Sequence, residues 1–170
     1  MSVLIRRGDR TVTETVSAGC TPATRFQLAS ISKQFTAAAV LLLAERGVLG
    51  LDDPVARRLG GCPPEWRDIT LHHLLAHSSG LAHWDEYPMI DLALRVEPAE
   101  LRETFRRVPP LFRPGAGWHY SSPGYVLLAN TVQEASDRSY QDFLAEEIFT
   151  PMGLTGTFAG CSASATARSC

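Results

Sequence analysis

Lysine is almost missing from this chain. Of 16 Lys and Arg residues in 170, only Lys33 is a lysine, and the basic residues stand against 18 acidic ones, for a net charge of -2. This balance leaves no positive surplus to neutralise phosphates, so a nucleic-acid partner is not expected. A side-chain amine able to lose its proton therefore exists at one position only, because the arginine guanidinium does not deprotonate in proteins.

Long hydrophobic runs are also missing. The longest apolar stretch covers residues 36–44, well short of the ~20 residues that span a bilayer. The apolar run before Arg6 is only three residues long (3–5), too short for the apolar segment of a secretory signal. We therefore expect no membrane partner, and a cytoplasmic location for the chain as written.

No metal or redox motif is apparent. The four cysteines have no C-x-x-C spacing, which favours unpaired thiols. His73 and His77 have the i, i+4 spacing of zinc ligands on a helix, but the glutamate of H-E-x-x-H is absent and no third ligand is apparent. Hydrogen bonding at a helix end is favoured, with residues 77–80 forming a turn. We expect no metal and no cofactor, with a zinc hydrolase as a remote alternative.

The chain is long enough for one domain with a real core. Alternating, β-branched segments at 3–5 and 11–16 predict a hairpin, and a Pro/Gly-rich loop is expected at 109–117. Helix formers and capping residues predict a largely buried helix over about 30–46, a short one over 71–77 capped by Thr70, and others over 98–107, 123–136 and 140–149. Residues 159–170 are small, polar and aperiodic, so they are expected to form a disordered tail after a domain over 1–158.

Ser30 and Lys33 form an S-x-x-K pair at the start of the long predicted helix. A serine hydroxyl needs a neighbouring base to become a nucleophile, and residues three apart on a helix share a face. Burial or the positive end of a helix would favour the neutral amine that a base requires. The competing interpretation is that Ser30 caps the helix and Lys33 is a solvated charge.

Tyr120 and Ser122 follow the Pro/Gly loop and precede another predicted helix. A tyrosine held beside a lysine can share its proton and act as acid or base. The structural alternative is a packed aromatic followed by Ser122 as helix N-cap, with Pro123 in the first turn.

Six segments, in this order, resemble the serine β-lactamase family, above all its branch of class C β-lactamases, D,D-peptidases and related esterases. They are FQLASISKQFTA (26–37), LGLDDP (49–54), ITLHHLLAHSSGL (69–81), FRPG (112–115), YSSPGY (120–125) and PMGL (151–154). The S-x-x-K element is itself a signature of β-lactamases and penicillin-binding proteins. The resemblance covers roughly residues 2 to 158.

The resemblance implies an α+β, β-lactamase/transpeptidase-like fold, here as a mostly helical fragment with an N-terminal hairpin. It also implies roles for four residues. Ser30 would attack a β-lactam, peptide or ester carbonyl and Lys33 would take its proton. Tyr120 would assist proton transfer, and Ser122 would bind Lys33 or substrate at a position where most close relatives have asparagine. The resemblance therefore implies a small-molecule or peptide substrate.

The family's third motif, K-T-G or H-x-G, does not occur after Tyr120. In the family this motif lies on a strand that supplies one of two oxyanion-hole N–H groups, the other coming from the nucleophilic serine, and losing one such donor costs about 10²–10³ in rate. A C-terminally truncated member lacking the last strands of the sheet is therefore expected. The alternative to an enzyme is a non-catalytic remnant or binding protein that keeps the helical part of the fold.

Overall fold

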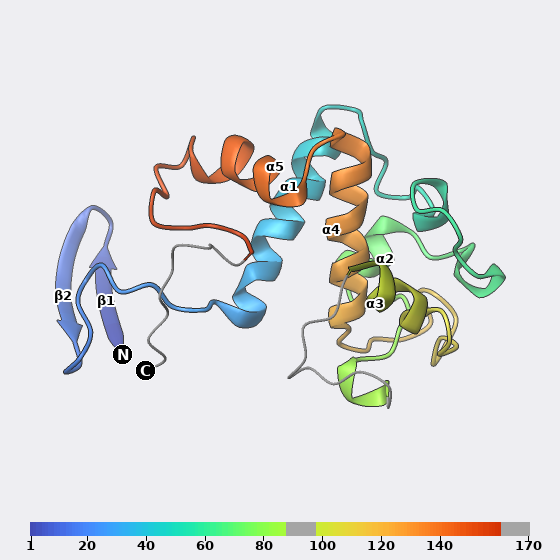
Figure 1. Cartoon of the computed structure of the whole chain (residues 1–170), viewed down its shortest axis with the longest axis horizontal. Helices are drawn as coiled ribbons and strands as arrows, with labels where there is room; N and C mark the ends of the chain where they lie inside the picture. Colours follow the sequence, from blue (N-terminus) through green and yellow to red (C-terminus); the bar gives the residue numbers. More distant parts are fainter. Residues whose placement is uncertain (88–97, 161–170) are drawn as a thin grey trace.

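The computed structural model of the chain describes residues 1–87 and 98–160, which form a β-hairpin and a helical body (Figure 1). The hairpin stands apart from the helices at one end of the molecule, joined to them by the segment that leads to α1. Most of the tail predicted over 159–170 lies outside the described residues. Within the described ranges, no helix is long and apolar enough to cross a membrane.

The hairpin consists of β1 (Ser2–Arg7) and β2 (Arg10–Val16), as the alternating sequence predicts. The strands pair antiparallel with Ser2 opposite Val16, and the register shifts by one residue between Ile5 and Arg6. Both faces are open to solvent, and Leu4 and Val12 are each 57% exposed. Its own ladder of backbone hydrogen bonds therefore supports the hairpin more than burial does.

Two long helices, α1 (Lys33–Glu45) and α4 (Ser122–Ser136), pack against each other at the centre of the helical body. The short helix α2 (Leu71–Leu75) packs on α4, and α5 (Tyr140–Leu144) contacts both long helices. A π-helical turn (Ala145–Phe149) continues α5, and α3 (Pro98–Phe105) follows the undescribed residues. Each predicted helix is present within two or three residues of its expected bounds.

The core lies between these helices and consists of aliphatic and aromatic side chains from all of them. It includes Val40, Leu43, Leu71, Leu74, Phe105, Leu128, Val132, Phe143 and Phe149. The expectation that α1 is largely buried is wrong for one of its faces. Its buried residues are Thr36, Ala39, Val40 and Leu43, whereas Leu41 on the opposite side is 50% exposed. The reason is that α4 and α5 pack along one side of α1 only.

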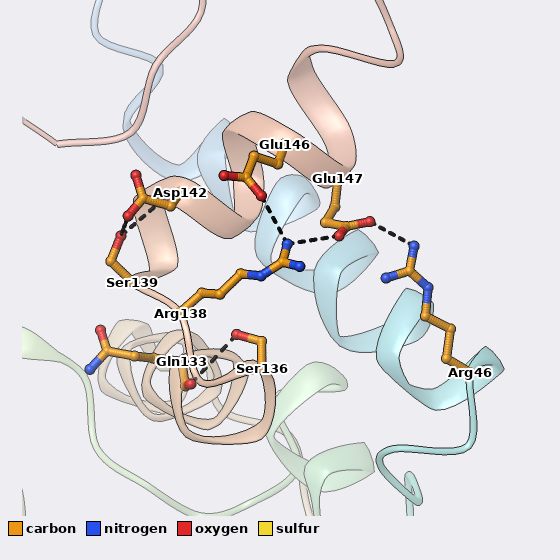
Figure 2. Close-up of polar contacts among 8 residues, drawn as sticks. All are labelled: Arg46, Gln133, Ser136, Arg138, Ser139, Asp142, Glu146 and Glu147. Atoms are coloured by element: carbon orange, nitrogen blue, oxygen red, sulfur yellow. Dashed lines mark hydrogen bonds and ion pairs between the residues drawn. The ribbon is translucent and has the colours of Figure 1, made fainter.

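The end of α1 is joined to the segment after α4 by a chain of ion pairs (Figure 2). Glu147 accepts hydrogen bonds from Arg46 at 2.7 Å and from Arg138 at 2.9 Å, and Arg138 also reaches Glu146 at 3.0 Å. The hydrogen bond from Arg46, followed by that from Arg138, holds the pKa of the Glu147 carboxyl below its usual value. These contacts fix the π-helical turn against the C-terminus of α1, at the end opposite Lys33.

Candidate active site

Ser30 and Lys33 meet because the chain enters α1 through a tighter turn. Ser30 lies in a 3₁₀ turn (Ala29–Ser32), and Lys33 is the first residue of α1. In a 3₁₀ turn the side chains at i and i+3 eclipse one another, which brings this pair together. Lys33 Nζ donates to Ser30 Oγ at 3.4 Å, and Ser30 itself is exposed. The capping role considered for Ser30 is wrong, since Ser32 occupies the N-cap position of α1.

The residue before Ser30 has an unusual backbone. Ala29 has φ of +46°, a left-handed conformation that costs a non-glycine residue roughly 1–2 kcal/mol. Ser32 Oγ donates to the Ala29 carbonyl at 2.6 Å and closes the turn. Strained backbone of this kind is found at sites where the surrounding structure must hold one side chain in place. Here it presents Ser30 to solvent beside Lys33.

Lys33 also reaches the start of α4. Its Nζ donates to Ser122 Oγ at 3.1 Å, across 89 positions of sequence. The same nitrogen lies 4.9 Å from the ring centroid of Tyr120 and 5.6 Å from that of Tyr125, within the range of cation–π attraction. Lys33 is half-buried and Ser122 is buried, so the alternative of a freely solvated lysine is wrong.

The Tyr120 hydroxyl lies within the same cluster. Burial raises the pKa of this phenol, but hydrogen bonds with Lys33, Ser30 and Ser122 and the charge of Lys33 together bring the pKa below its ordinary value. The structure thus brings together all four residues that the sequence singled out. A nucleophilic hydroxyl, an amine and an acidified phenol in mutual contact can pass a proton among them.

Two loops position Tyr120. The turn at 77–80 and the Pro/Gly loop run together, with Leu111 N–H donating to Gly80 C=O, Gly115 N–H to Ser78 C=O and His119 N–H to His77 C=O, at 2.8–2.9 Å. Gly80 has φ of +81°, and a Cβ there would stand 2.2 Å from the Phe112 carbonyl oxygen. Only glycine allows this approach, which fixes the course of the loop just before Tyr120.

The N-cap of α4 is Ser121, and the prediction that Ser122 caps this helix is wrong by one residue. Ser121 has extended backbone and its Oγ accepts from Gly124 N–H at 3.1 Å, while also donating to Ala82 C=O at 2.9 Å. Pro123 takes the second helical position without cost because the first N–H groups of a helix have no intrahelical partner. The shift leaves the Ser122 hydroxyl available for Lys33.

The two histidines with zinc-ligand spacing make other contacts. His73 Nδ1 accepts from the Thr70 N–H at 3.2 Å, and His77 Nδ1 accepts from the Ser121 N–H at 3.1 Å. No group of three or more His, Cys, Asp or Glu side chains is arranged for a metal in residues 1–87 and 98–160. Thr70 caps α2 as predicted, and His77 lies in the turn that follows.

One residue of this region was missed by sequence reasoning. His83 Nδ1 accepts from the Ser122 N–H at 3.2 Å, and its ring lies 5.1 Å from that of Tyr120. No local spacing marks His83, because its partner is 39 positions away. The interaction exists only once the loops have folded together.

The fold agrees with what comparison with known proteins shows. The family model described as Beta-lactamase matches residues 1–169, so the chain belongs to the β-lactamase family. Its fold is that of the β-lactamase/transpeptidase group, seen here as a mostly helical part with a two-stranded sheet. The family's named members include penicillin-binding proteins, an esterase and β-lactamases.

Three relatives illustrate the range. The chain is 40% identical to penicillin-binding protein 4* of Bacillus subtilis over 140 residues (78% of this chain, 30% of that protein). It is 35% identical to esterase EstB of Burkholderia gladioli (77% and 37%). The crystal structure of D-amino acid amidase from Ochrobactrum anthropi superposes with a TM-score of 0.75 at 29% identity (89% and 47%). The chain thus spans about a third of the length of these two curated relatives.

Proposed function

We propose that this chain carries the acylation machinery of a serine hydrolase, with Ser30 as nucleophile, Lys33 as its base and Tyr120 as a proton relay. The observation that carries this proposal is the contact of Lys33 Nζ with both Ser30 Oγ and Ser122 Oγ, at 3.4 Å and 3.1 Å, beneath the Tyr120 ring. Two segments far apart in sequence supply these groups. A base beside the Ser30 hydroxyl activates it as a nucleophile, which fits the family to which the chain belongs.

The first step forms an acyl-enzyme. Ser30 Oγ bonds to the carbonyl carbon of the substrate while its proton passes to the neutral amine of Lys33, and the carbonyl electron pair moves onto oxygen. When the tetrahedral intermediate collapses, the bond to the leaving nitrogen or oxygen breaks. The leaving atom takes the proton of the Tyr120 hydroxyl, and Lys33 returns its extra proton to Tyr120.

The second step is hydrolysis. A water oxygen attacks the Ser30 ester, one of its protons passes to the Tyr120–Lys33 pair, and Ser30 Oγ leaves and recovers a proton from that pair. The acidified phenol suits this exchange because its pKa lies below the ordinary value and so closer to working pH. Ser30, Lys33 and Tyr120 account for every proton that these two steps transfer.

Ser122 holds the amine in place. Its hydroxyl is buried and hydrogen-bonded to Lys33 Nζ, which restricts the rotation of the lysine end group. The amine, held by Ser122 on the α4 side, also contacts Ser30. A second role for Ser122, a hydrogen bond to substrate, is the one that the family resemblance implies for this position.

The substrate is an acyl compound with a small-molecule or peptide leaving group. The names of the relatives include a penicillin-binding protein, an esterase and a D-amino acid amidase, and a carbonyl open to a serine nucleophile is common to all three. An ester, a β-lactam and a D-alanyl amide are therefore the three classes to examine.

The second candidate is a binding protein that does not turn over. Residues 121–170 contain neither lysine nor histidine, so the K-T-G and H-x-G motifs do not occur after Tyr120. If no such motif completes the site, one oxyanion donor in place of two would lower the rate by about 10²–10³. Recognition of acyl compounds without measurable turnover would follow.

Hydrolysis assays with a matched serine control test the proposal. The purified chain is given a p-nitrophenyl ester, a chromogenic cephalosporin and D-alanine p-nitroanilide, beside Ser30→Ala and Ser136→Ala variants. Ser136 lies at the far end of α4, where its hydroxyl contacts only Gln133 C=O among the described residues (Figure 2). Product release that Ser30→Ala abolishes and Ser136→Ala retains supports the proposal. Equal rates in all three proteins contradict it.

A further inference from the structure

Two histidines hold the segment that carries Tyr120 and Ser122. His77 Nδ1 accepts the backbone N–H of Ser121 at 3.1 Å, and His83 Nδ1 accepts that of Ser122 at 3.2 Å. Successive peptide groups are thus bound by rings that follow α2, about 40 positions earlier in the chain. Ser121 and Ser122 are buried, so an unmatched N–H at either position would be costly.

The same rings pack on Tyr120. The ring centroids of His77 and His83 lie 4.6 Å and 5.1 Å from that of Tyr120, one tilted and one close to edge-on. The phenol therefore lies against both imidazoles while Lys33 lies over its ring at 4.9 Å. Moving either imidazole would move the tyrosine and the peptide group that follows it.

The hydrogen bonds fix the protonation state of both rings. A backbone N–H can only donate, so each Nδ1 must be an acceptor, and each ring is neutral with its proton on Nε2. Protonation would place a second hydrogen between Nδ1 and the peptide nitrogen. Two donors would then face each other, and the hydrogen bond would be lost.

His77 occupies a backbone conformation that favours glycine. It lies one residue past the C-cap of α2 with φ of +57°, where Ser78 N–H bonds to His73 C=O and His77 N–H to Leu74 C=O. This is the Schellman arrangement, which commonly has glycine at that position. The left-handed backbone sends the His77 ring away from α2 and toward Tyr120, a direction that the helix itself would not provide.

The charges around the two rings oppose an added proton at His77. Burial lowers the pKa of His77, the charge of Lys33 from α1 lowers it further, and a protonated His83 would lower it again, while Tyr120 and Tyr125 contribute rings. On the side of His83, the Glu86 carboxylate binds the His83 backbone N–H at 2.6 Å and the His119 ring at 2.8 Å. Glu86 is the nearby anion on this side.

We propose that His77 and His83 are positioning residues that hold Tyr120 and Ser122 against Lys33 while both rings are neutral, and that protonation of either ring releases this segment. The catalytic consequence rests on the function proposed above. The structural part stands on the two hydrogen bonds and the ring contacts alone.

Nuclear magnetic resonance of the ¹⁵N-labelled chain tests the structural part without any substrate. At neutral pH both imidazoles are expected as Nε2–H tautomers. On lowering the pH from about 8 to about 5, the Ser121 and Ser122 amide signals should shift with the midpoints of His77 and His83 respectively. An Nδ1–H tautomer in either ring at neutral pH, or amide signals that ignore the titration of their partner, would overturn the proposal.

Paired variants test the consequence for reactivity. In His83→Asn the amide oxygen takes the place of Nδ1 and does not titrate, whereas His83→Phe keeps a ring and loses the acceptor. The backbone φ of -95° at this position suits either residue. Labelling of Ser30 by a fluorophosphonate should slow about fivefold to tenfold in H83F and stay within about twofold of wild type in H83N, the size of one hydrogen bond. His77→Asn and His77→Phe give the second pair, since asparagine tolerates the left-handed region.

The outcomes separate the two proposals. Equal labelling rates for the Asn and Phe variants, with both folded by circular dichroism, overturn the positioning role. If the wild-type chain does not react with the fluorophosphonate, the proposed function fails, and the tautomers and amide titrations still decide whether the histidines hold the segment. In H83N the Ser122 amide signal should shift with pH only as His77 becomes protonated, and a Ser122 shift that does not follow His77 would also count against the proposal.

Discussion

Lys33 and Ser122 are joined by a hydrogen bond of 3.1 Å although 89 positions separate them in the chain. Each is the first residue of a long helix, so the N-termini of α1 and α4 converge where the two side chains meet. The positive ends of both helix dipoles therefore lie near the Lys33–Ser122 contact. This convergence is the structural basis for the predictions on Lys33 and Ser122.

Lys33→Arg separates charge from basicity. Arginine keeps the positive charge but does not give up its proton, so it cannot accept one from Ser30. Labelling of Ser30 by a fluorophosphonate should slow by about 10²–10⁴, the usual contribution of a general base. The melting temperature is measured in parallel to show that the variant is folded. An arginine variant that labels at the wild-type rate would remove Lys33 from the mechanism.

Ser121→Ala and Ser122→Ala form a matched pair at adjacent buried positions. Ser121 caps α4, so its loss should lower the free energy of unfolding by about 0.5–2 kcal/mol. Ser122 contacts Lys33 instead, so its loss should slow labelling of Ser30 more than it lowers stability. Urea titration and labelling rates measure the two effects. The reverse assignment, with Ser121 controlling reactivity and Ser122 stability, would contradict the site as described.

The four tyrosines should titrate in two groups. Tyr120 has a lowered pKa because hydrogen bonds with Lys33, Ser30 and Ser122 outweigh its burial. Burial raises the pKa of the other three, Tyr87, Tyr125 and Tyr140. Absorbance near 295 nm should show one phenol ionising below about pH 10 and three above it.

In Tyr120→Phe the phenol ionisation below about pH 10 should disappear, and the three ionisations above it should remain. The sign for stability follows from the direction of the shift, since the folded chain releases the Tyr120 proton more readily than the unfolded chain does. Tyr120 therefore adds stability as the pH rises through its lowered pKa toward the ordinary value. An ionisation below about pH 10 that persists in Tyr120→Phe would show that the lowered pKa belongs to another tyrosine.

Gly80→Ala and Gly60→Ala test the loop that positions Tyr120. A Cβ at Gly80 would stand 2.2 Å from Phe112 C=O and would occupy a left-handed backbone, whereas one at Gly60 would meet nothing within 4 Å. We expect Gly80→Ala to lower the free energy of unfolding by about 2 kcal/mol or more and Gly60→Ala to change it by about 0.5 kcal/mol or less. Chemical denaturation measures both. Similar values for the two variants would show that the loops do not meet at Gly80.

The sequence predicts the local structure of this chain well because local structure depends on residues that are close together in the sequence. Thr70 is an N-cap in sequence and in structure, and the spacing of Ser30 and Lys33 is enough to place them on one side of a turn. The cap of α4 was predicted one residue late, because Ser121 and Ser122 are equally good caps and only the contact of Ser121 with Ala82 C=O favours the first.

Tertiary contacts account for what the sequence does not predict. The left-handed backbone of His77 depends on the end of α2, and the direction of its ring matters only because the Pro/Gly loop brings Tyr120 beside it. His83 has no helical or strand periodicity to mark it, and its partner lies in another segment. Residues of this kind are found from the folded chain alone, whereas the proposed nucleophile and base are indicated by their S-x-x-K spacing and by the motifs around them.

The central claim is that Ser30 is an activated nucleophile, and covalent labelling tests it most directly. The intact mass of the chain is measured after incubation with a fluorophosphonate, with a full-length relative such as esterase EstB treated in parallel. We predict a gain of one phosphonyl group per chain, located on Ser30 by peptide mapping and absent from Ser30→Ala. An unchanged mass under conditions where the relative reacts, or a label on a residue other than Ser30, would contradict the account.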